Sequence, residues 1–300
     1  MAPSARVSQE MIVSERDLER RMRGADSVDF QLHTVYSDGH WQPVELFDYL
    51  AAHGFRAVAA TDHDTLEHAD ELVSLGAERG IIVLRACEVS TNWRGGRTDL
   101  LCFAGELTSG ALANFVRGIE RSQYENTLAV KESLLRRGYK FPQMADELAF
   151  QGGKLRRPSD NARLLLRHSY AETPSAAMEM IRDAGYVSIT VPLAGAVEAA
   201  HASGAVALIA HPGRDSDGIQ LHSPPVLAGI LAEIPIDGAE VLYPLHTSQQ
   251  VEEFSDFIAE RGLLRSAGSD SHGPRGRLPI SYPASTCAAL LARCGVEVAL

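Results

Sequence analysis

Histidines and carboxylates recur in this sequence at or soon after the ends of short apolar segments that resemble β-strands. Four of the eleven histidines are placed in this way. The polar residues so placed are Gln31, His33, Asp38, Asp62, His63, Glu88, His211, Asp270 and His272, and Asp99 stands just before another such segment. Neutral imidazole and carboxylate are the ligands that Zn, Mn and Fe take in proteins. Several such metals close together suit hydrolysis by a metal-activated water.

A structural explanation competes at every one of these positions. A single His or Asp after a strand more often caps a helix or forms a turn. The recurrence of such residues at successive strand ends of one chain favours a shared metal site over a series of unrelated caps.

The segments that must position these residues alternate between strand and helix. Pro43 and Gly54 mark the start and stop of one helix, and further helices are expected at 65–79, 196–204, 224–233 and 248–261. Strands are expected at 28–33, 56–61, 81–86, 100–105, 205–210, 239–243 and 263–268. This alternation predicts an α/β fold with parallel strands, as a closed or nearly closed (β/α) barrel or, alternatively, a doubly wound open sheet. In both folds the carboxyl ends of the strands share one face, where ligands gather.

Residues 109–185 break the alternation, because they show mainly helical periodicity. We therefore expect an N-terminal extension at 1–25, a barrel formed by 26–108 and 186–300, and a helical insertion subdomain at 109–185.

Composition limits the class of protein. With 28 basic and 39 acidic residues in 300, the net charge of −11 disfavours binding to a nucleic-acid polymer. No apolar run resembles a signal peptide or a membrane span, and the four cysteines have no CxxC spacing. We expect a soluble cytoplasmic protein with reduced, buried cysteines and no membrane partner.

The motifs QLHTVYSDG, TDHDT, CEVST, AHPGR, EVLYPLHT and GSDSHG, in this order from about residue 28 to 275, resemble the PHP (polymerase and histidinol phosphatase) family. They are most similar to its stand-alone metal-dependent phosphoesterases, which act on nucleotides such as nucleoside 3′,5′-bisphosphates. The resemblance implies a distorted seven-stranded (β/α) barrel that holds two to three divalent metal ions, of manganese, zinc or iron.

The resemblance also implies a ligand set. The family's ligand positions fall on His33, Asp38, His63, Glu88, His211, Asp270 and His272. Two positions depart from the family pattern: Gln31 stands where the first histidine of His-x-His is expected, and Asp99 stands at another usual histidine position. Asp99 remains a good ligand for manganese, whereas the Gln31 amide is a weaker donor. These departures put the metal count and the reaction rate in question more than the fold.

Three arginines are candidates for binding phosphate. The segment RRPSDNARLL at 156–165 resembles a family helix start, and the resemblance implies that Arg163 faces the substrate phosphate. Arg157 and Arg214 are further candidates, with solvated surface positions as the alternative. Asp62 is expected to orient the His63 imidazole.

The expected function is metal-dependent hydrolysis of a small phosphate monoester, with a nucleotide as the favoured substrate. One alternative is hydrolysis of another bond, such as an amide, by the same chemistry. The other is a nucleotide-binding protein whose catalysis is impaired by Gln31 and Asp99.

Overall fold

The computed structural model describes residues 20–104, 110–148, 155–216 and 218–299. Its strands are β1 (Arg21–Arg23), β2 (Ser27–Leu32), β3 (Phe55–Ala60), β4 (Ile82–Val83), β5 (Arg85–Trp93), β6 (Gly96–Ala104), β7 (Val191–Pro192), β8 (Val206–Ile209), β9 (Gly238–Leu242), β10 (Leu264–Ala267), β11 (Tyr282–Pro283) and β12 (Glu297–Ala299). Each strand expected from the sequence has a counterpart. The short strands β1, β7, β11 and β12 were not expected, nor was the long strand β5, of which only the first two residues fall within the expected segment 81–86.

The helices are α1 (Pro43–Ala52), α2 (Ala69–Glu78), α3 (Ala111–Arg136), α4 (Met144–Glu147), α5 (Pro158–Arg167), α6 (Pro174–Asp183), α7 (Leu193–Ala202), α8 (Pro224–Glu233), α9 (Ser248–Arg261) and α10 (Ala288–Arg293), with a 3₁₀ turn at Ala284–Cys287. None of these described helices combines the length and apolar character that crossing a bilayer requires.

The strands form two main sheets and one separate pair. The order β10–β9–β8–β6–β5–β7 makes a six-stranded sheet, β11–β2–β3–β4 makes a four-stranded sheet, and β1 pairs with β12. Isolated bridges connect the two sheets at Leu32–Ser271 and at His63–Glu88. The α/β class is therefore confirmed, while the hydrogen-bonded ladders of the described residues do not form the continuous ring of an ideal barrel.

Strand direction differs from the sequence-based expectation at β6. This strand is antiparallel to both β5 and β8, so the sheet is mixed rather than all parallel. The cause is local: Arg94 and Gly95, both with positive φ, close a two-residue hairpin between β5 and β6, and a connection this short can join only antiparallel strands.

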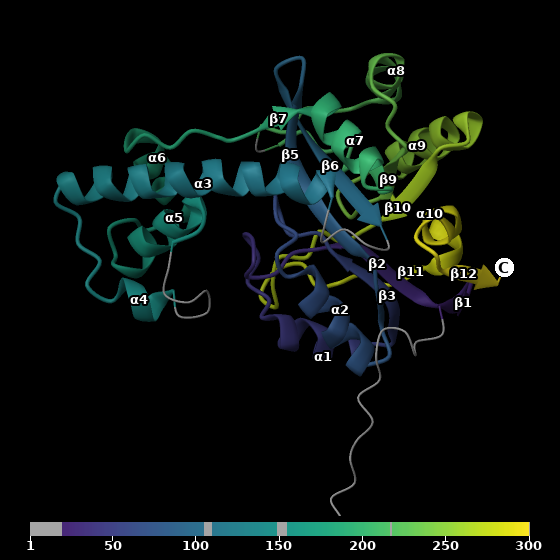
Figure 1. Cartoon of the computed structure of the whole chain (residues 1–300), viewed down its shortest axis with the longest axis horizontal. Coiled ribbons are helices and arrows are strands. Elements are labelled where there is room, and N and C mark those ends of the chain that lie inside the picture. The colour runs from purple at the N-terminus through teal and green to yellow at the C-terminus, as the bar shows by residue number, and fades with distance from the viewer. Residues whose placement is uncertain (1–19, 105–109, 149–154, 217, 300) are drawn as a thin grey trace, which may run out of the picture.

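Alternate residues of the strands face two different environments, as the period of a strand requires. One set from both sheets, including Phe30 of β2 and Phe103 of β6, packs into a shared core with ring centroids 6.4 Å apart. The opposite set packs against helices: β2 and β3 against α1 and α2, and β5, β6, β8 and β9 against α7, α8 and α9. Helices therefore cover the outer faces of both sheets (Figure 1).

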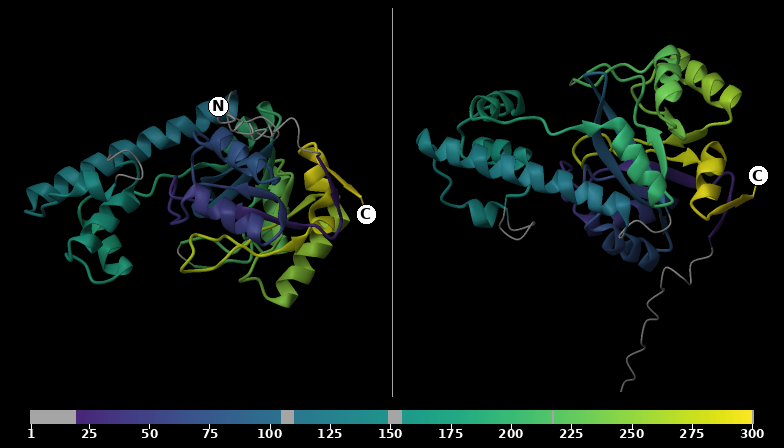
Figure 2. Two further views of the ribbon diagram at one scale, coloured as in Figure 1. Left: turned by 90° about the horizontal axis from the view of Figure 1, so that it is seen from below. Right: turned by 45° about the horizontal axis from the view of Figure 1, so that its top comes forward.

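The helical region between β6 and β7 lies to one side of the sheets. Helix α3 runs away from them, and α5 and α6 pack along its far half, as Figures 1 and 2 show. These three helices share a small apolar core, which includes Val130, Leu134, Leu165 and Ile181. Parts of the proposed extension (1–19), barrel (105–108) and insertion (109 and 149–154) lie outside the described residues.

Candidate metal centre

The predicted site residues come together where the strands end. His33 follows β2, His63 follows β3, His211 follows β8, and Asp270 and His272 follow β10. Glu88 and Asp99 lie within β5 and β6 rather than beyond the ends of strands. Because β6 runs antiparallel, its first half reaches the same face as the carboxyl ends of the parallel strands, which brings Asp99 to the site.

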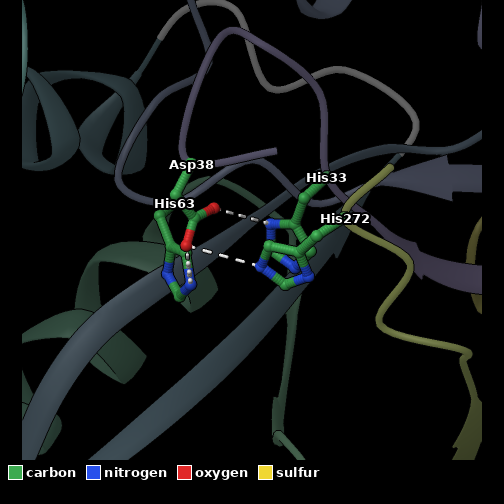
Figure 3. Close-up of side chains that lie close together, drawn as sticks. All are labelled: His33, Asp38, His63 and His272. Atoms are coloured by element: carbon green, nitrogen blue, oxygen red, sulfur yellow. Dashed lines mark ion pairs between the residues drawn. The ribbon is translucent and has the colours of Figure 1, made fainter. Parts of the chain in front are cut away.

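Asp38 is at the centre of one cluster (Figure 3), which also contains His33, His63 and His272. Its carboxylate oxygens lie 3.4 Å from His272 Nε2, 3.7 Å from His33 Nδ1 and 3.9 Å from His63 Nε2. The imidazoles of His33 and His272 stack with centroids 4.3 Å apart. Four donor atoms thus converge on a volume of the size that one metal ion needs.

Glu88 joins two further clusters, one with His33 and Asp270 and one with Asp99 and His211. Its Oε2 lies 3.2 Å from His33 Nε2, and its Oε1 lies 3.0 Å from His211 Nε2. His33 Nε2 is also 3.2 Å from Asp270 Oδ1. One carboxylate with an oxygen toward each cluster is suited to bridge two closely spaced metal ions.

Several donor atoms at this site are buried without a hydrogen bond in the described part of the chain. They are both ring nitrogens of His33 and Nδ1 of His63 and of His211. Burying a polar atom without a partner is unfavourable, and metal coordination would compensate for it. The buried His/Asp/Glu clusters are therefore consistent with a multiple-metal site.

The protonation of these groups reflects their mutual contacts. Burial alone would raise the pKa of Glu88, but the neighbouring imidazoles of His63, His211 and His33 hold it well below its usual value. Burial and the Glu88 charge raise the pKa of Asp99, and Arg97 offsets only part of that rise. The site therefore concentrates negative charge, which a divalent cation would neutralise.

Backbone strain also gathers at these positions. His211 and Asp270 adopt positive φ values of 29° and 55°, a conformation that is unfavourable for residues other than glycine. Asp29, which is fully buried, accepts hydrogen bonds from the Ser269 and Ile280 amides, both at 2.9 Å, and so holds the loop that carries Asp270.

Gln31 lies next to the bridging carboxylate. Its Nε2 donates to Glu88 Oε2 at 3.0 Å, and its Oε1 is buried without a hydrogen bond among the described residues. In this arrangement the Gln31 amide supports Glu88 through hydrogen bonding.

Asp62 contacts the turn that carries Asp38. It accepts hydrogen bonds from the Thr34 amide and hydroxyl, both at 2.8 Å, and from the Ser37 hydroxyl at 2.6 Å. Nδ1 of His63 has no hydrogen-bond partner in the described chain. The contacts of Asp62 therefore position the 34–38 turn, and the expected hydrogen bond to the His63 ring is not among them.

Arginines surround the clusters. Arg214 Nη1 and Arg277 Nη1 lie 3.8 and 3.7 Å from Asp270 Oδ2, and Arg97 forms an ion pair with Asp99. Arg163 forms an ion pair with Asp160 at 3.7 Å and interacts electrostatically with Asp38. Arg214 and Arg163 were expected from the sequence, whereas Arg97 and Arg277 were not. For Arg97 a signal existed, because Arg-x-Asp in a strand places both side chains on one face.

A cavity of about 480 Å³ opens over the clusters. Tyr243, which donates to Asp270 Oδ2 at 3.1 Å, lines it and was also missed, although it directly follows β9. A neighbouring cavity of about 160 Å³ shares Asp38, His63 and Arg97 with it and reaches Arg157 and Gln123 of the helical region. Arg157 therefore lies in the second cavity and Arg214 in the first.

All four cysteines are free and buried, as expected. Cys87 and Cys102 face each other across β5 and β6.

Comparisons with known proteins agree with this description. The PHP domain family matches residues 29–171. A 3′,5′-nucleoside bisphosphate phosphatase from Chromobacterium violaceum is 29% identical over 261 residues, which cover 83% of this chain and 88% of the relative. A 5′-3′ exoribonuclease from Haemophilus influenzae is 25% identical over 257 residues, covering 83% and 90%. A phosphoribosyl 1,2-cyclic phosphate 1,2-diphosphodiesterase from Eggerthella lenta is 27% identical over 265 residues, covering 84% and 96%.

Solved structures show the same fold. A protein from Bifidobacterium adolescentis described as a metal-dependent phosphoesterase superposes with a TM-score of 0.75 at 24% identity, covering 92% of this chain and 98% of the other. A protein from Chromobacterium violaceum described as an amidohydrolase, with bound sulfate and no metal, gives a TM-score of 0.68 at 26% identity, covering 85% and 90%. With the family match over residues 29–171 and the buried His/Asp/Glu clusters, the chain contains a PHP domain of the metal-dependent phosphoesterase type.

Proposed function

We propose that this protein hydrolyses a small phosphate monoester, with a nucleotide as the favoured substrate. The observation that carries the proposal is the position of Glu88, which joins two buried donor clusters beneath a cavity lined by Arg97, Arg214 and Arg277. Metal ligands below and cations around one cavity suit a phosphate group, because both bind its oxygens.

Eight residues would hold two to three divalent metal ions: His33, Asp38, His63, Glu88, Asp99, His211, Asp270 and His272. Equal numbers of imidazoles and carboxylates fit manganese, zinc or iron. When bound, such ions activate water and neutralise charge on the phosphate oxygens.

The arginines would bind and orient the phosphate. Arg214 and Arg277 lie on one side of the cavity beside Asp270, and Arg163 and Arg157 approach from the helical region. A guanidinium fork matches phosphate geometry. Asp62 would act through the 34–38 turn, and thereby through Asp38.

The relatives guide the choice of substrate. Their names include a nucleoside bisphosphate, a cyclic ribosyl phosphate and RNA. The net charge of −11 favours the small substrates among these.

The test is phosphate release from nucleoside monophosphates, nucleoside 3′,5′-bisphosphates, sugar phosphates and a 5′-phosphorylated oligonucleotide, with Mn²⁺ and with a chelated control. We expect Mn²⁺-dependent release from at least one small monoester. Glu88→Gln should lower this rate by about 100-fold or more, since it removes a charge shared by two clusters. The exposed Glu78→Gln serves as the matched control. Absence of release from every monoester would contradict the proposal.

Hydrolysis of an amide is the second candidate. It is favoured by the structural likeness to a protein described as an amidohydrolase and by the departures at Gln31 and Asp99. Mn²⁺-dependent cleavage of N-acyl amino acids without phosphate release would support it. Tight nucleotide binding without any turnover would instead indicate a binding protein.

A further inference from the structure

The β5–β6 hairpin presents three successive side chains from the core to the mouth of the site. Leu101, Asp99 and Arg97 lie two residues apart on β6, so they share one face of the strand. Leu101 packs in the shared core, Asp99 belongs to the cluster with Glu88 and His211, and Arg97 lines the cavity. The register is fixed, because Asp99 pairs with Ser90 and Arg97 with Asn92.

Arg97 and Asp99 form a two-point ion pair. Arg97 Nε lies 3.0 Å from Asp99 Oδ1, and Arg97 Nη2 lies 3.0 Å from Asp99 Oδ2. Asp99 is 1% exposed, whereas Arg97 is 32% exposed. The pair therefore connects a fully buried carboxylate to a cation that the solvent, and a ligand, can reach.

Asp99 needs this partner more than a histidine would. Its Oδ2 is 4.0 Å from His211 Nε2, and Glu88 contributes a second negative charge to the same cluster. A buried carboxylate beside another carboxylate is costly unless a cation accompanies it. A neutral imidazole at this position would carry no charge to compensate.

Arg97 also occupies the junction between the two cavities. Of the described arginines that line them, it is the one that lines both. The contacts with Asp99 use Nε and Nη2, and Nη1 takes no part in them.

We propose that Arg97 and Asp99 work as one unit, in which Arg97 holds Asp99 in place for the metal site and binds an anionic oxygen of the substrate at the junction of the two cavities. The binding of substrate rests on the function proposed above, whereas the support of the metal site does not. The unit would allow a carboxylate to stand where the family motif carries histidine.

A double-mutant cycle of Arg97→Gln, Asp99→His and both together tests the proposal. Bound Mn²⁺ is counted by elemental analysis and its affinity is measured by calorimetry, without substrate. We expect Arg97→Gln to weaken Mn²⁺ binding by at least about 10-fold at one site, because the buried Asp99 loses its partner. The double variant should regain Mn²⁺ binding, since the neutral imidazole that Asp99→His introduces requires no counter-charge.

Kinetics provide the second readout. With the active monoester, KM should rise by about 10- to 100-fold in Arg97→Gln, the value of a charged hydrogen bond, and should stay raised in the double variant despite restored metal binding. Arg97→Lys should recover part of the loss in KM. The control is Arg94→Gln, in the same hairpin, where the exposed Arg94 pairs with Glu233, and thermal unfolding confirms that each variant is folded.

The outcomes separate this inference from the proposed function. Unchanged Mn²⁺ binding in Arg97→Gln would overturn the coupling with Asp99. An equal loss of Mn²⁺ affinity in Arg97→Gln and in the double variant would overturn it as well. An unchanged KM in Arg97→Gln would overturn the contact with substrate. If the wild-type protein releases no phosphate from any substrate, the proposed function and the substrate contact fail, while the Mn²⁺ cycle still decides the coupling.

Discussion

At the scale of single residues, the protonation state of Asp38 depends on the imidazoles around it. Burial alone would raise the pKa of its carboxyl, but the imidazoles of His63, His272 and His33 hold it well below its usual value. Removing this carboxylate leaves three histidines as the only donors of the Asp38 cluster among the described residues. The loss of one ligand of the Asp38 cluster should therefore abolish binding of the metal ion by the whole cluster.

We accordingly expect Asp38→Ala and His63→Ala each to reduce the Mn²⁺ count by about one ion and the rate of hydrolysis by about 100-fold or more. Elemental analysis and phosphate release measure the two effects. Asp48→Asn, an exposed carboxylate on α1, is the control. Full activity in Asp38→Ala or in His63→Ala would refute the assignment of that residue.

Because His222 is buried, we expect the stability of the fold to depend on pH. Nε2 of His222 lies 2.9 Å from the Thr98 hydroxyl, and burial together with the charge of His211 lowers the pKa of His222 to about 4. The unfolded chain binds this proton near pH 6.5, so the folded state loses stability as the pH falls from 6.5 towards 4. Between pH 7 and pH 5 the loss from this group is about 2 kcal/mol.

Denaturant unfolding at both pH values should therefore show a loss about 2 kcal/mol smaller in His222→Gln than in the wild type. His53→Gln, at an exposed site, should keep the wild-type dependence. If the unfolding free energy fell equally in the wild type and in His222→Gln, the lowered pKa of His222 in the folded state would be refuted.

Residue types and their positions after strands pointed to seven of the eight residues that the structure gathers into clusters, and Asp99 was added by the resemblance to the PHP family. The contacts of Asp62 and the position of Arg277 were not predictable in the same way. Arg277 follows the last site motif without a strand of its own, and its approach to Asp270 depends on how the loop after β10 returns to the site.

At the scale of elements, the ends of β2 and β10 meet at a point where only glycine fits. A Cβ on Gly268 would lie 2.4 Å from the Gln31 Cβ, 2.5 Å from Glu240 Oε1 and 2.9 Å from the backbone nitrogen of Gln31. Gly268→Ala should therefore push β2 and β10 apart beneath Glu88 and Asp270.

Overpacking of this kind costs about 1–3 kcal/mol of unfolding free energy, and we expect hydrolysis to fall as well, since Gln31 supports Glu88. Gly118→Ala on α3, with no atom within 4 Å of the added Cβ, should instead stabilise by about 0.5–1 kcal/mol. Denaturant unfolding compares the two. A Gly268→Ala variant as stable as the wild type would show that the strands can separate without cost.

The strands and long helices were predictable because their apolar periodicity is strong. The direction of β6 was not, because strand–helix alternation on both sides suggested one parallel sheet. The reversal depends on the Arg94–Gly95 turn, whose two positive φ values specify a hairpin. Recognising that turn would have placed Asp99 within the strand rather than before it.

At the scale of the whole molecule, two sheets, their outer helices and the α3–α6 region converge on one site. A metal ion bound there would contact segments that are far apart in the chain, which come together only in the folded state. Its binding should therefore raise the free energy of unfolding. At a Mn²⁺ concentration 100 times its dissociation constant, one site contributes about 2.7 kcal/mol. In a chain of this size that corresponds to a rise in Tm of roughly 4 °C.

Thermal unfolding of chelator-treated protein, with and without added Mn²⁺, measures this effect. Ca²⁺ at equal concentration serves as the comparison, because it prefers six to eight oxygen ligands over imidazole. Equal Tm values with and without Mn²⁺ would argue against a metal site that forms only in the folded state.

The overall class could be predicted from alternation, and the helical region from its change of period. Neither pattern predicts how the helical region packs against the sheets. That placement brings Arg157 and Gln123 into the cavity beside His63, and it results from tertiary packing rather than from local sequence.

Anomalous X-ray scattering from crystals grown with Mn²⁺ would test the central claim most directly. We predict anomalous peaks among Asp38, His63 and His272, among His33, Glu88 and Asp270, and among Glu88, Asp99 and His211, with at least two of the three occupied. Peaks absent from these clusters at saturating Mn²⁺, or present only elsewhere on the protein, would contradict the account of this site as a metal centre.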